Sequence, residues 1–532
     1  MLRKSVFTLV AALMAVPLIT QDVDAQDLGT IDFKTSAKSA EAQEHFLHGV
    51  LLLHSFTFES AEKTFKAALA AEPDFFMAYW GEAMSHNHPL LPERNPDLPR
   101  AVLKRLGATP EERLEKAPTE REKGFLAAVE LLFGEGSEEE RATAYSKSMG
   151  ELAASYPDDA EVQAFYAVSL LGRVRFTRDK DFRIRMKAGA IAENIYREHP
   201  DHPGAAHYII HSFDDPVHAP LALTAAYRYA EIAPDAAHAI HMPSHIFIQH
   251  GMWDRVVKSN DASYAAAIRL WQKRDGLTDT EKFYNDVYVW HALDWGQYGQ
   301  LQRGDYEKAM KSVELLKPVA AISKASMAKD GPRTMAARYV VESEQWKTEM
   351  LGDDATPEEV FANGMSAVKL GETETAEKAE AKLTAMYDER KAKDGEDRTR
   401  PLGIMAKELG ALVKLAQGQG DDAMALMKEA TALAEDMGPP AGAATPIKPA
   451  YELYGEILLE LGKADEAAEQ FETSLLRMQN RTLSLRGMAR AAEKSGDAEA
   501  ARTNYEKLLE ILGDNPENPS YQEAKGFVSD GE

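Results

Sequence analysis

The segments LGKADEAAEQFETSL (residues 461–475) and SGDAEAARTNYEKLL (residues 495–509) are two copies of one unit, 34 residues apart. The positions that match at this offset include Gly462 and Gly496, Ala467 and Ala501, and Phe471 and Tyr505. Apolar residues within each copy recur at the spacing of one helix face. A small residue suits the contact between the two helices of a unit, and a large apolar residue fills the gap to the next unit. We therefore expect stacked helical hairpins in this region.

The same pattern extends over much of the chain. Strand signals are scarce, and a 34-residue period of helix, turn and helix is the tetratricopeptide signature. Further segments that fit it are residues 48–74, 78–84, 295–313 and 408–430. The sequence predicts an all-α fold, a tetratricopeptide-repeat solenoid of antiparallel helix pairs. Its expected parts are an N-terminal solenoid over residues 26–330, with a histidine-rich concave site, and C-terminal repeats over residues 331–532.

The composition excludes several classes of protein. The 532 residues include 61 Lys and Arg against 86 Asp and Glu, which gives a formal net charge of −25. Such a chain lacks the basic face that binding to phosphates requires, so we expect no nucleic-acid partner. The absence of cysteine rules out disulfides, thiolate zinc sites, iron–sulfur clusters and a cysteine nucleophile. Any bound metal would depend on His, Asp, Glu or Met.

Residues 1–25 have the pattern of a targeting segment. Arg3 and Lys4 precede an apolar stretch at residues 6–19, and small or apolar residues precede the expected cleavage after Ala25. We predict a cleaved signal peptide and a periplasmic or secreted bacterial protein with no stable membrane insertion afterwards. The alternative is a membrane anchor, but the stretch is shorter than the roughly 20 residues that a membrane span needs.

Histidine is confined to the first part of the chain. All 15 histidines lie within the first 291 residues, and nine of them fall between residues 199 and 250. Two pairs, His207 with His211 and His241 with His245, have a spacing of four residues and repeat at an offset of 34. Residues i and i+4 share one helix face, and the first helices of successive repeats lie side by side. Four histidines would then face one groove, where helices can hold a transition metal.

Other residues are candidates to complete this site. Imidazole and carboxylate ligands suit Zn, Cu, Fe or Mn, so such a metal is the predicted cofactor. The additional candidate ligands are His54, His291, Asp214, Asp215 and His218. A separate candidate set, in the helix-end motif SHNHP, is His86 and His88. The competing interpretations are a polar groove without metal and histidines that only pack and form hydrogen bonds.

Several nearby histidines are assigned to structural roles. We expect His238 and His250 to be cap or surface residues, and His199 and His202 to lie in a proline-containing loop. Pro243 lies inside the second pair, where it either kinks the helix or begins a new one. The i, i+4 geometry therefore applies more directly to the first pair than to the second.

Three segments carry a resemblance to known proteins. HPGAAHYIIHSFDDPVHAP (202–220), HMPSHIFIQHGMW (241–253) and HALDWGQYGQLQRGDY (291–306) resemble exported bacterial tetratricopeptide-repeat proteins. The resemblance covers residues 41–310, and the C-terminal part is similar only as generic repeats. It implies an all-α solenoid and a periplasmic or secreted setting, and it implies no particular reaction.

Two functions remain open from the sequence. In the first, the solenoid is a scaffold that holds a protein or peptide partner in its concave groove. In the second, it is a metal-dependent enzyme, hydrolytic or oxidative, whose metal activates water or oxygen. The sequence contains no GxxxxGK[ST], HExxH or GxSxG motif. The two hypotheses differ in what they require of the imidazole nitrogens, because a metal site needs them to converge.

Overall fold

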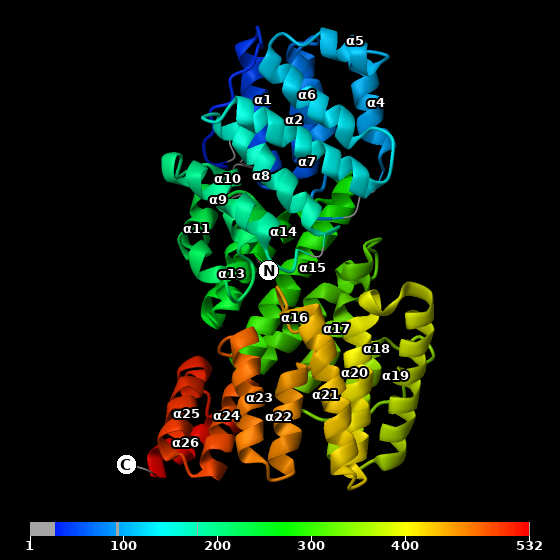
Figure 1. Cartoon of the computed structure of the whole chain (residues 1–532), viewed down its shortest axis with the longest axis vertical. Coiled ribbons are helices and arrows are strands. Elements are labelled where there is room, and N and C mark those ends of the chain that lie inside the picture. Colours follow the sequence, from blue (N-terminus) through cyan, green and yellow to red (C-terminus); the bar gives the residue numbers. More distant parts are fainter. Residues whose placement is uncertain (1–26, 92–94, 178, 531–532) are drawn as a thin grey trace, which may run out of the picture.

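The computed structural model describes residues 27–91, 95–177 and 179–530, so the predicted signal peptide lies outside the described residues. Within these ranges every regular element is a helix, and the all-α prediction is confirmed (Figure 1). Helices that follow one another along the chain pack as antiparallel neighbours, as in tetratricopeptide-type repeats. None of the described helices combines the length and the apolar character needed to cross a lipid bilayer.

The helices form an N-terminal and a C-terminal series. The first series is α1 (Ala40–His54), α2 (Phe58–Ala71), α3 (Phe76–Met84), α4 (Asp97–Leu106), α5 (Pro110–Glu115), α6 (Glu120–Leu132), α7 (Glu138–Ser155), α8 (Ala160–Val174), α9 (Arg183–Glu198), α10 (Pro203–Ser212), α11 (Ala219–Ile232), α12 (Ala237–His241), α13 (Pro243–Gln249), α14 (Trp253–Trp271) and α15 (Asp279–Gln302). The second series is α16 (Tyr306–Ala320), α17 (Ser326–Ser343), α18 (Pro357–Leu370), α19 (Thr373–Asp394), α20 (Glu396–Ala416), α21 (Gly420–Met437), α22 (Ala450–Glu460), α23 (Ala464–Arg477), α24 (Thr482–Ser495), α25 (Ala498–Leu512) and α26 (Pro519–Asp530). Residue 330, near which a boundary between two parts was expected, lies inside α17.

Glycines allow the large apolar residue of each repeat to fill the space between helices. The fully buried ring of Phe471 on α23 lies against Gly455 of α22 and Gly487 of α24. A Cβ at Gly455 would stand 2.7 Å from this ring, and one at Gly487 would overlap it. The same packing occurs near the other end of the chain, at Phe65, Gly49 and Gly81. The 34-residue pattern therefore specifies the packing within and between neighbouring repeats.

Gly487→Ala is expected to lower the free energy of unfolding by about 1–3 kcal/mol, because the added methyl group overpacks against Phe471. Urea denaturation measures this change. Gly526→Ala in α26 is the matched control, since nothing lies within 4 Å of a Cβ placed there. The control is expected to be neutral or stabilising by up to about 1 kcal/mol, because alanine favours helix more than glycine does. Equal destabilisation by both substitutions would contradict the packing described.

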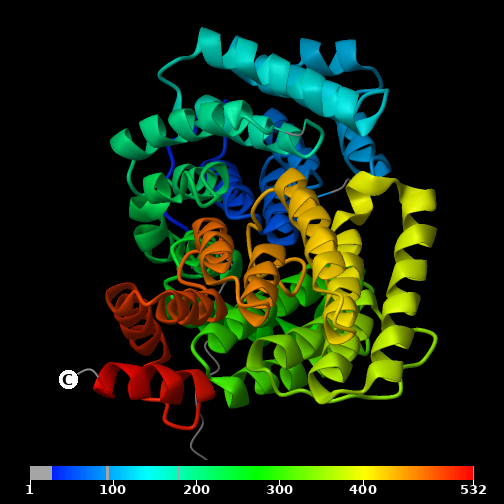
Figure 2. The same cartoon turned by 60° about the horizontal axis from the view of Figure 1, so that its bottom comes forward.

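The C-terminal series turns back onto the histidine-rich part of the chain, as comparison of Figures 1 and 2 shows. Trp253 Nε1 donates to the backbone oxygen of Asn480 (2.9 Å), and Asn480 Nδ2 donates to the backbone oxygen of His250 (3.1 Å). The loop between α23 and α24 thus lies on the start of α14. The repeats near residue 250 are not an open concave surface, because the later repeats pack against them.

A buried ion-pair network also joins distant helices. Arg481, which is fully buried, contacts both carboxylate oxygens of Glu452 (2.7 and 2.8 Å) and one oxygen of Glu342 (2.7 Å). It also donates to the hydroxyl of Tyr298 (3.0 Å), and Lys448 binds Glu452 at 2.9 Å. These residues come from α15, α17, the start of α22 and the start of α24, so the network fixes how the two series meet.

Candidate metal centre

Three histidines from two helices form the first cluster, which we name triad I. His207 and His211 come from α10 and His238 comes from α12, and one ring nitrogen of each lies within 4.8 Å of the others. Nε2 of His207 and Nε2 of His238 are 3.2 Å apart. α10 begins at Pro203, whose fixed φ suits a first helical turn, and it sets His207 and His211 one turn apart. The structure keeps the predicted first pair together and adds His238.

Three more histidines form a second cluster, which we name triad II. His241 ends α12, His245 lies in α13 and His291 lies in α15, and their ligand nitrogens are again within 4.8 Å of one another. Pro243 begins α13, so the chain starts a new helix inside the predicted second pair. The ring centroids of His241 and His245 nevertheless remain 5.0 Å apart.

The two triads are direct neighbours. The ring centroids of His211 and His245 are 5.6 Å apart, and those of His238 and His241 are 6.2 Å apart. Centroid distances within triad I run from 4.7 to 6.4 Å, and those within triad II from 4.1 to 6.0 Å. Because the distances between triads match those within them, the six imidazoles form one continuous cluster among α10, α12, α13 and α15.

Acceptors outside the triads fix the orientation of three rings. His207 Nδ1 donates to the backbone oxygen of His54 (2.6 Å), His241 Nδ1 to Oδ1 of Asn260 (2.7 Å) and His245 Nδ1 to Oδ2 of Asp214 (2.7 Å). Carbonyl and carboxylate oxygens only accept hydrogen bonds, so each Nδ1 carries the proton and each Nε2 keeps its lone pair. Histidines that ligate metals are oriented by outer partners of this kind.

Four buried imidazole nitrogens of the cluster have no hydrogen-bond partner among the described residues. They are Nε2 of His211, His241 and His245 and Nδ1 of His291. A buried polar atom without a partner costs about 1–3 kcal/mol. Three of the four belong to triad II, whose histidines can each offer a ligand nitrogen within 4.8 Å of the others. A transition metal, which imidazole nitrogens bind at about 2.0–2.1 Å, would satisfy them.

The environment also favours the neutral form of five rings of the cluster. Burial lowers the pKa of five imidazoles well below the ordinary value, and the neighbouring rings lower it further. These residues are His207, His211, His238, His241 and His291. Burial disfavours the charged form, and two protonated rings would repel each other. The neutral imidazole is the form that ligates a metal.

A third cluster of His54, Glu161 and His202 is buried beside triad I. His54 Nε2 lies 2.9 Å from Glu161, and its Nδ1 lies 2.8 Å from the hydroxyl of Tyr208. His202 Nδ1 accepts the backbone N–H of Ala205 (3.2 Å), so a proton lies on Nε2, which faces Glu161 at 3.2 Å. A protonated nitrogen offers no lone pair to a metal, so we interpret this cluster as a structural histidine–carboxylate network.

The network accounts for the position of His54. Burial acts to raise the pKa of Glu161, but His202 and His54 hold that pKa well below its usual value. The imidazole of His54, which the sequence predicted as a ligand, is therefore engaged with Glu161 and Tyr208. Only its backbone oxygen meets triad I, through His207. The structure makes His54 a positioning residue of the cluster.

The predicted ligands Asp214 and His218 also lie outside both triads. Asp214 accepts hydrogen bonds from His245 and from Gln249 Nε2 (3.1 Å), so it orients a histidine of triad II. His218 Nδ1 lies 2.9 Å from Asp215, whose carboxylate also accepts the backbone N–H of Val217 just before α11. His218 and Asp215 therefore form a separate pair at the start of α11.

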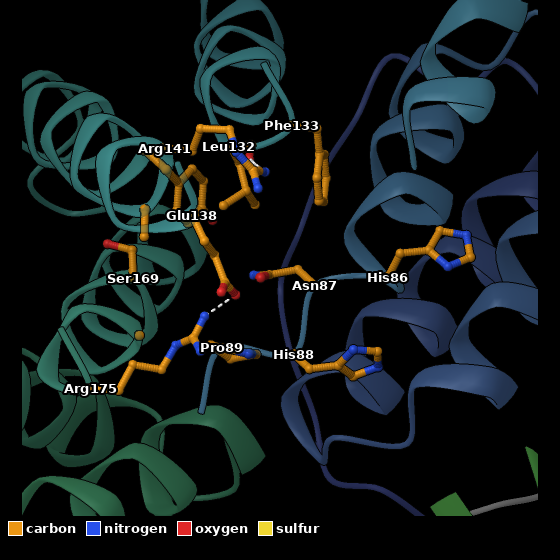
Figure 3. Close-up of a pocket in the computed structure, with 13 residues that line it drawn as sticks. His86, Asn87, His88, Pro89, Leu132, Phe133, Glu138, Arg141, Ser169 and Arg175 are labelled. Atoms are coloured by element: carbon orange, nitrogen blue, oxygen red, sulfur yellow. Dashed lines mark hydrogen bonds and ion pairs between the residues drawn. The ribbon is translucent and has the colours of Figure 1, made fainter. Parts of the chain in front are cut away.

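His86 and His88 belong to neither triad. Figure 3 shows them on the segment that follows α3, beside a separate pocket. They follow α3 and line a pocket of only about 40 Å³, together with an ion pair between Arg175 and Glu138. The ring of His88 packs 4.7 Å from that of Tyr284. His86 and His88 thus belong to the contact between α3 and the helices around it.

The structure adds two residues to the histidine cluster that the sequence did not predict there. His238, which was expected to be a cap or surface residue, completes triad I, and Asn260 orients His241. The spacing of His238 to His241, one helical turn, was the available signal. Nothing in the sequence pointed to Asn260. His250 and His199 follow α13 and α9 as C-cap residues.

An aromatic side chain separates triad II from an open cleft. The ring of Trp295 lies 4.3 Å from that of His245 and 5.0 Å from that of His241. Trp295 also lines a cleft of about 660 Å³, together with Trp290, Arg338 and the loop at residues 437–445. Solvent in the cleft is therefore one indole ring away from the histidine cluster.

Comparisons with known proteins support no assignment to a family. No protein-family model matches the chain, and no curated protein matches it in sequence. It is similar to a solved chain of the APC/C hetero-tetramer Cut9–Hcn1, with 12% identity, a TM-score of 0.35, and coverage of 92% of this chain and 75% of the other. It is also similar to the human IFIT1 dimer with PPP-AAAA, with 12% identity, a TM-score of 0.37, and coverage of 90% and 92%. These low values carry no argument about function.

Proposed function

We propose that this protein is a transition-metal-binding protein in which helical repeats hold the metal through buried histidines. One observation carries the proposal. In triad II, His241, His245 and His291 each have a buried ring nitrogen without a hydrogen-bond partner among the described residues, and each can offer a ligand nitrogen within 4.8 Å of those of the other two. Three imidazoles with an open fourth position are a known ligand set for a transition metal.

The orienting hydrogen bonds support this proposal over simple packing. Histidines that merely fill a core would satisfy both ring nitrogens, whereas His241 and His245 use only Nδ1, toward Asn260 and Asp214. The donor set is imidazole alone, which suits Cu, Zn or Fe. We further propose that the chain is exported after cleavage near Ala25 and acquires its metal in the periplasm or outside the cell.

The repeats add a second role to this proposal. A helical-repeat scaffold is suited to interactions, and the solenoid would hold a protein or peptide partner in its concave groove, as expected from the sequence. The alternative of a metal-dependent enzyme, hydrolytic or oxidative, is favoured by the cleft beside Trp295, because it offers room for a small molecule near triad II. A bound metal there would act as a Lewis acid or activate water.

Metal analysis of the purified mature chain tests the proposal. After treatment with a chelator and dialysis against Cu, Zn, Fe or Mn, the wild type is expected to retain at least one equivalent of one metal. His245→Gln, which replaces a ligand with a neutral amide of similar size, is expected to lose metal from triad II. His218→Gln is the matched control, because His218 is bound to Asp215 outside the cluster, and it should retain the wild-type metal content.

Two results would contradict the proposal. One is metal well below one equivalent in the wild type after loading with each of the four ions. The other is identical metal content in the wild type and in both His245→Gln and His291→Gln. Circular dichroism of each variant shows whether the helices remain folded, so that loss of metal is separated from loss of structure.

A further inference from the structure

We infer that triads I and II form one dinuclear copper centre that takes a small anion as a bridge between the two ions. This inference rests on the proposed function and extends it from one ion to a pair. Its starting point is the spacing of the triads, whose rings approach to 5.6 Å at His211 and His245. That centroid distance is shorter than the longest centroid distance within triad I, which is 6.4 Å, and within triad II, which is 6.0 Å.

The helices make the two triads a single unit. The five-residue helix α12 supplies His238 to triad I and His241 to triad II, one turn apart. A shift of α12 would therefore move a ligand of both ions together. In proteins that hold two metal ions as one centre, the ions stand about 3.5–4 Å apart. The rings of one triad come as close to the rings of the other as the rings within one triad come to each other. This spacing is compatible with two ions at that separation.

The charge of the ligands favours copper and an anion. All six ligands are imidazoles, which bind a metal in their neutral form. The adjacent carboxylates are already engaged, Asp214 with His245 Nδ1 and Glu161 with His54. Two divalent ions would thus place four positive charges in a buried site with no anionic ligand, which is costly. Monovalent copper, or divalent copper pairs bridged by hydroxide, reduce this charge, and imidazole is a good ligand for copper.

Two aromatic rings limit the size of the bridging ligand. Phe56 packs on triad I, with ring centroids 4.3 Å from His207 and 5.6 Å from His238. Trp295 packs on triad II, 4.3 Å from His245. Both aromatic residues are buried, at 8% and 6% exposure. A ligand between the two ions must therefore be small, such as hydroxide or azide.

The backbone at Phe56 is an independent sign that this ring is held in place. Its φ is +54°, a left-handed conformation that is strained for a bulky residue, and its backbone oxygen accepts a hydrogen bond from Tyr288 (2.6 Å). Strained backbone of this kind persists where the surrounding structure requires it, and it concentrates at functional sites. Here the strained turn between α1 and α2 directs an aromatic ring onto triad I.

Electron paramagnetic resonance (EPR) of the copper-loaded mature chain tests the inference. With copper(II) sulfate the wild type is expected to bind two ions whose spins couple through the bridge, so most of the bound copper gives no EPR signal. X-ray absorption is expected to show a copper–copper distance of about 3.5–4 Å. His245→Gln should bind one ion with a full EPR signal, several-fold higher per copper than the wild type. His211→Gln provides the same test from triad I, and His218→Gln is the control.

The outcomes separate this inference from the proposed function. Two ions with a full EPR signal and no copper–copper distance would overturn the dinuclear centre while leaving metal binding intact. One ion in the wild type, of any EPR intensity, would also overturn it. Absence of metal after loading with Cu, Zn, Fe or Mn would overturn the proposed function as well. The wild-type measurement decides the question even if a variant fails to fold.

Discussion

Arg481→Met is expected to lower the free energy of unfolding by about 3–5 kcal/mol, because it removes the buried cation that contacts both Glu342 and Glu452. Burial already raises the pKa of Glu342, and Arg481 provides the main charge that opposes this rise. Burial also acts to raise the pKa of Glu452, which Arg481 and Lys448 hold well below its usual value. Removing Arg481 leaves Lys448 as the remaining positive charge in contact with Glu452.

Urea denaturation of the purified chain measures this effect. Arg490→Met is the matched control, since it removes the same side chain from a more exposed pair with Glu523, and it should cost less than about 1 kcal/mol. Equal losses for the two substitutions would contradict a specific role for the network. Because the network joins α15 and α17 to α22 and α24, we expect Arg481→Met also to loosen the contact between Trp253 and Asn480, visible as increased amide exchange there.

Loading the histidine cluster with metal is expected to raise the free energy of unfolding by about 4 kcal/mol per site when free metal exceeds Kd 1,000-fold. The gain arises because the nitrogens of triads I and II converge only in the folded chain. Coordination also supplies partners for the buried nitrogens that otherwise have none. Thermal denaturation of the chelator-treated chain, before and after addition of copper or zinc, measures the effect as a higher Tm.

Two controls make this result specific. The double variant His211→Gln and His245→Gln removes one ligand from each triad and is expected to show little or no rise in Tm. Calcium, which prefers oxygen ligands, is expected to leave the wild type unchanged. A rise of equal size in the double variant, or with calcium, would show that the metal stabilises the chain somewhere other than the histidine cluster.

The repeat pattern predicted the packing between neighbouring helices well, because the residues in contact lie close together in the sequence. Phe471 meets Gly455 and Gly487, which lie 16 residues before and after it in neighbouring helices. Each helix pair buries its apolar face against the next pair, so residue size and a 34-residue period are sufficient to specify the contact. The pairing of His207 with His211 follows in the same way from the geometry of one helix.

The composition of the histidine cluster was only partly predictable. His291 was a candidate because it lies in a distinctive motif, and no spacing rule connected it to His241, 50 residues earlier. His54 was a candidate because LLLHSF is similar to YIIHSF, but its imidazole faces Glu161, on α8. His238 was expected to be a cap or surface residue, but it lies on the short helix α12 with its Nε2 3.2 Å from Nε2 of His207. These relations depend on how non-adjacent helices cross.

The sequence alone therefore determined the helical-repeat architecture, the two histidine pairs and the exclusion of cysteine chemistry, since each follows from residue type and short-range spacing. The tertiary structure decided which six histidines share one cluster and which nitrogen of each oriented ring carries the proton. The reason is physical. Small rotations between repeats accumulate along the stack, so the convergence of α10, α12, α13 and α15 depends on the packing of the whole array. Ring orientation, in turn, depends on the acceptors His54, Asp214 and Asn260, which no local pattern places.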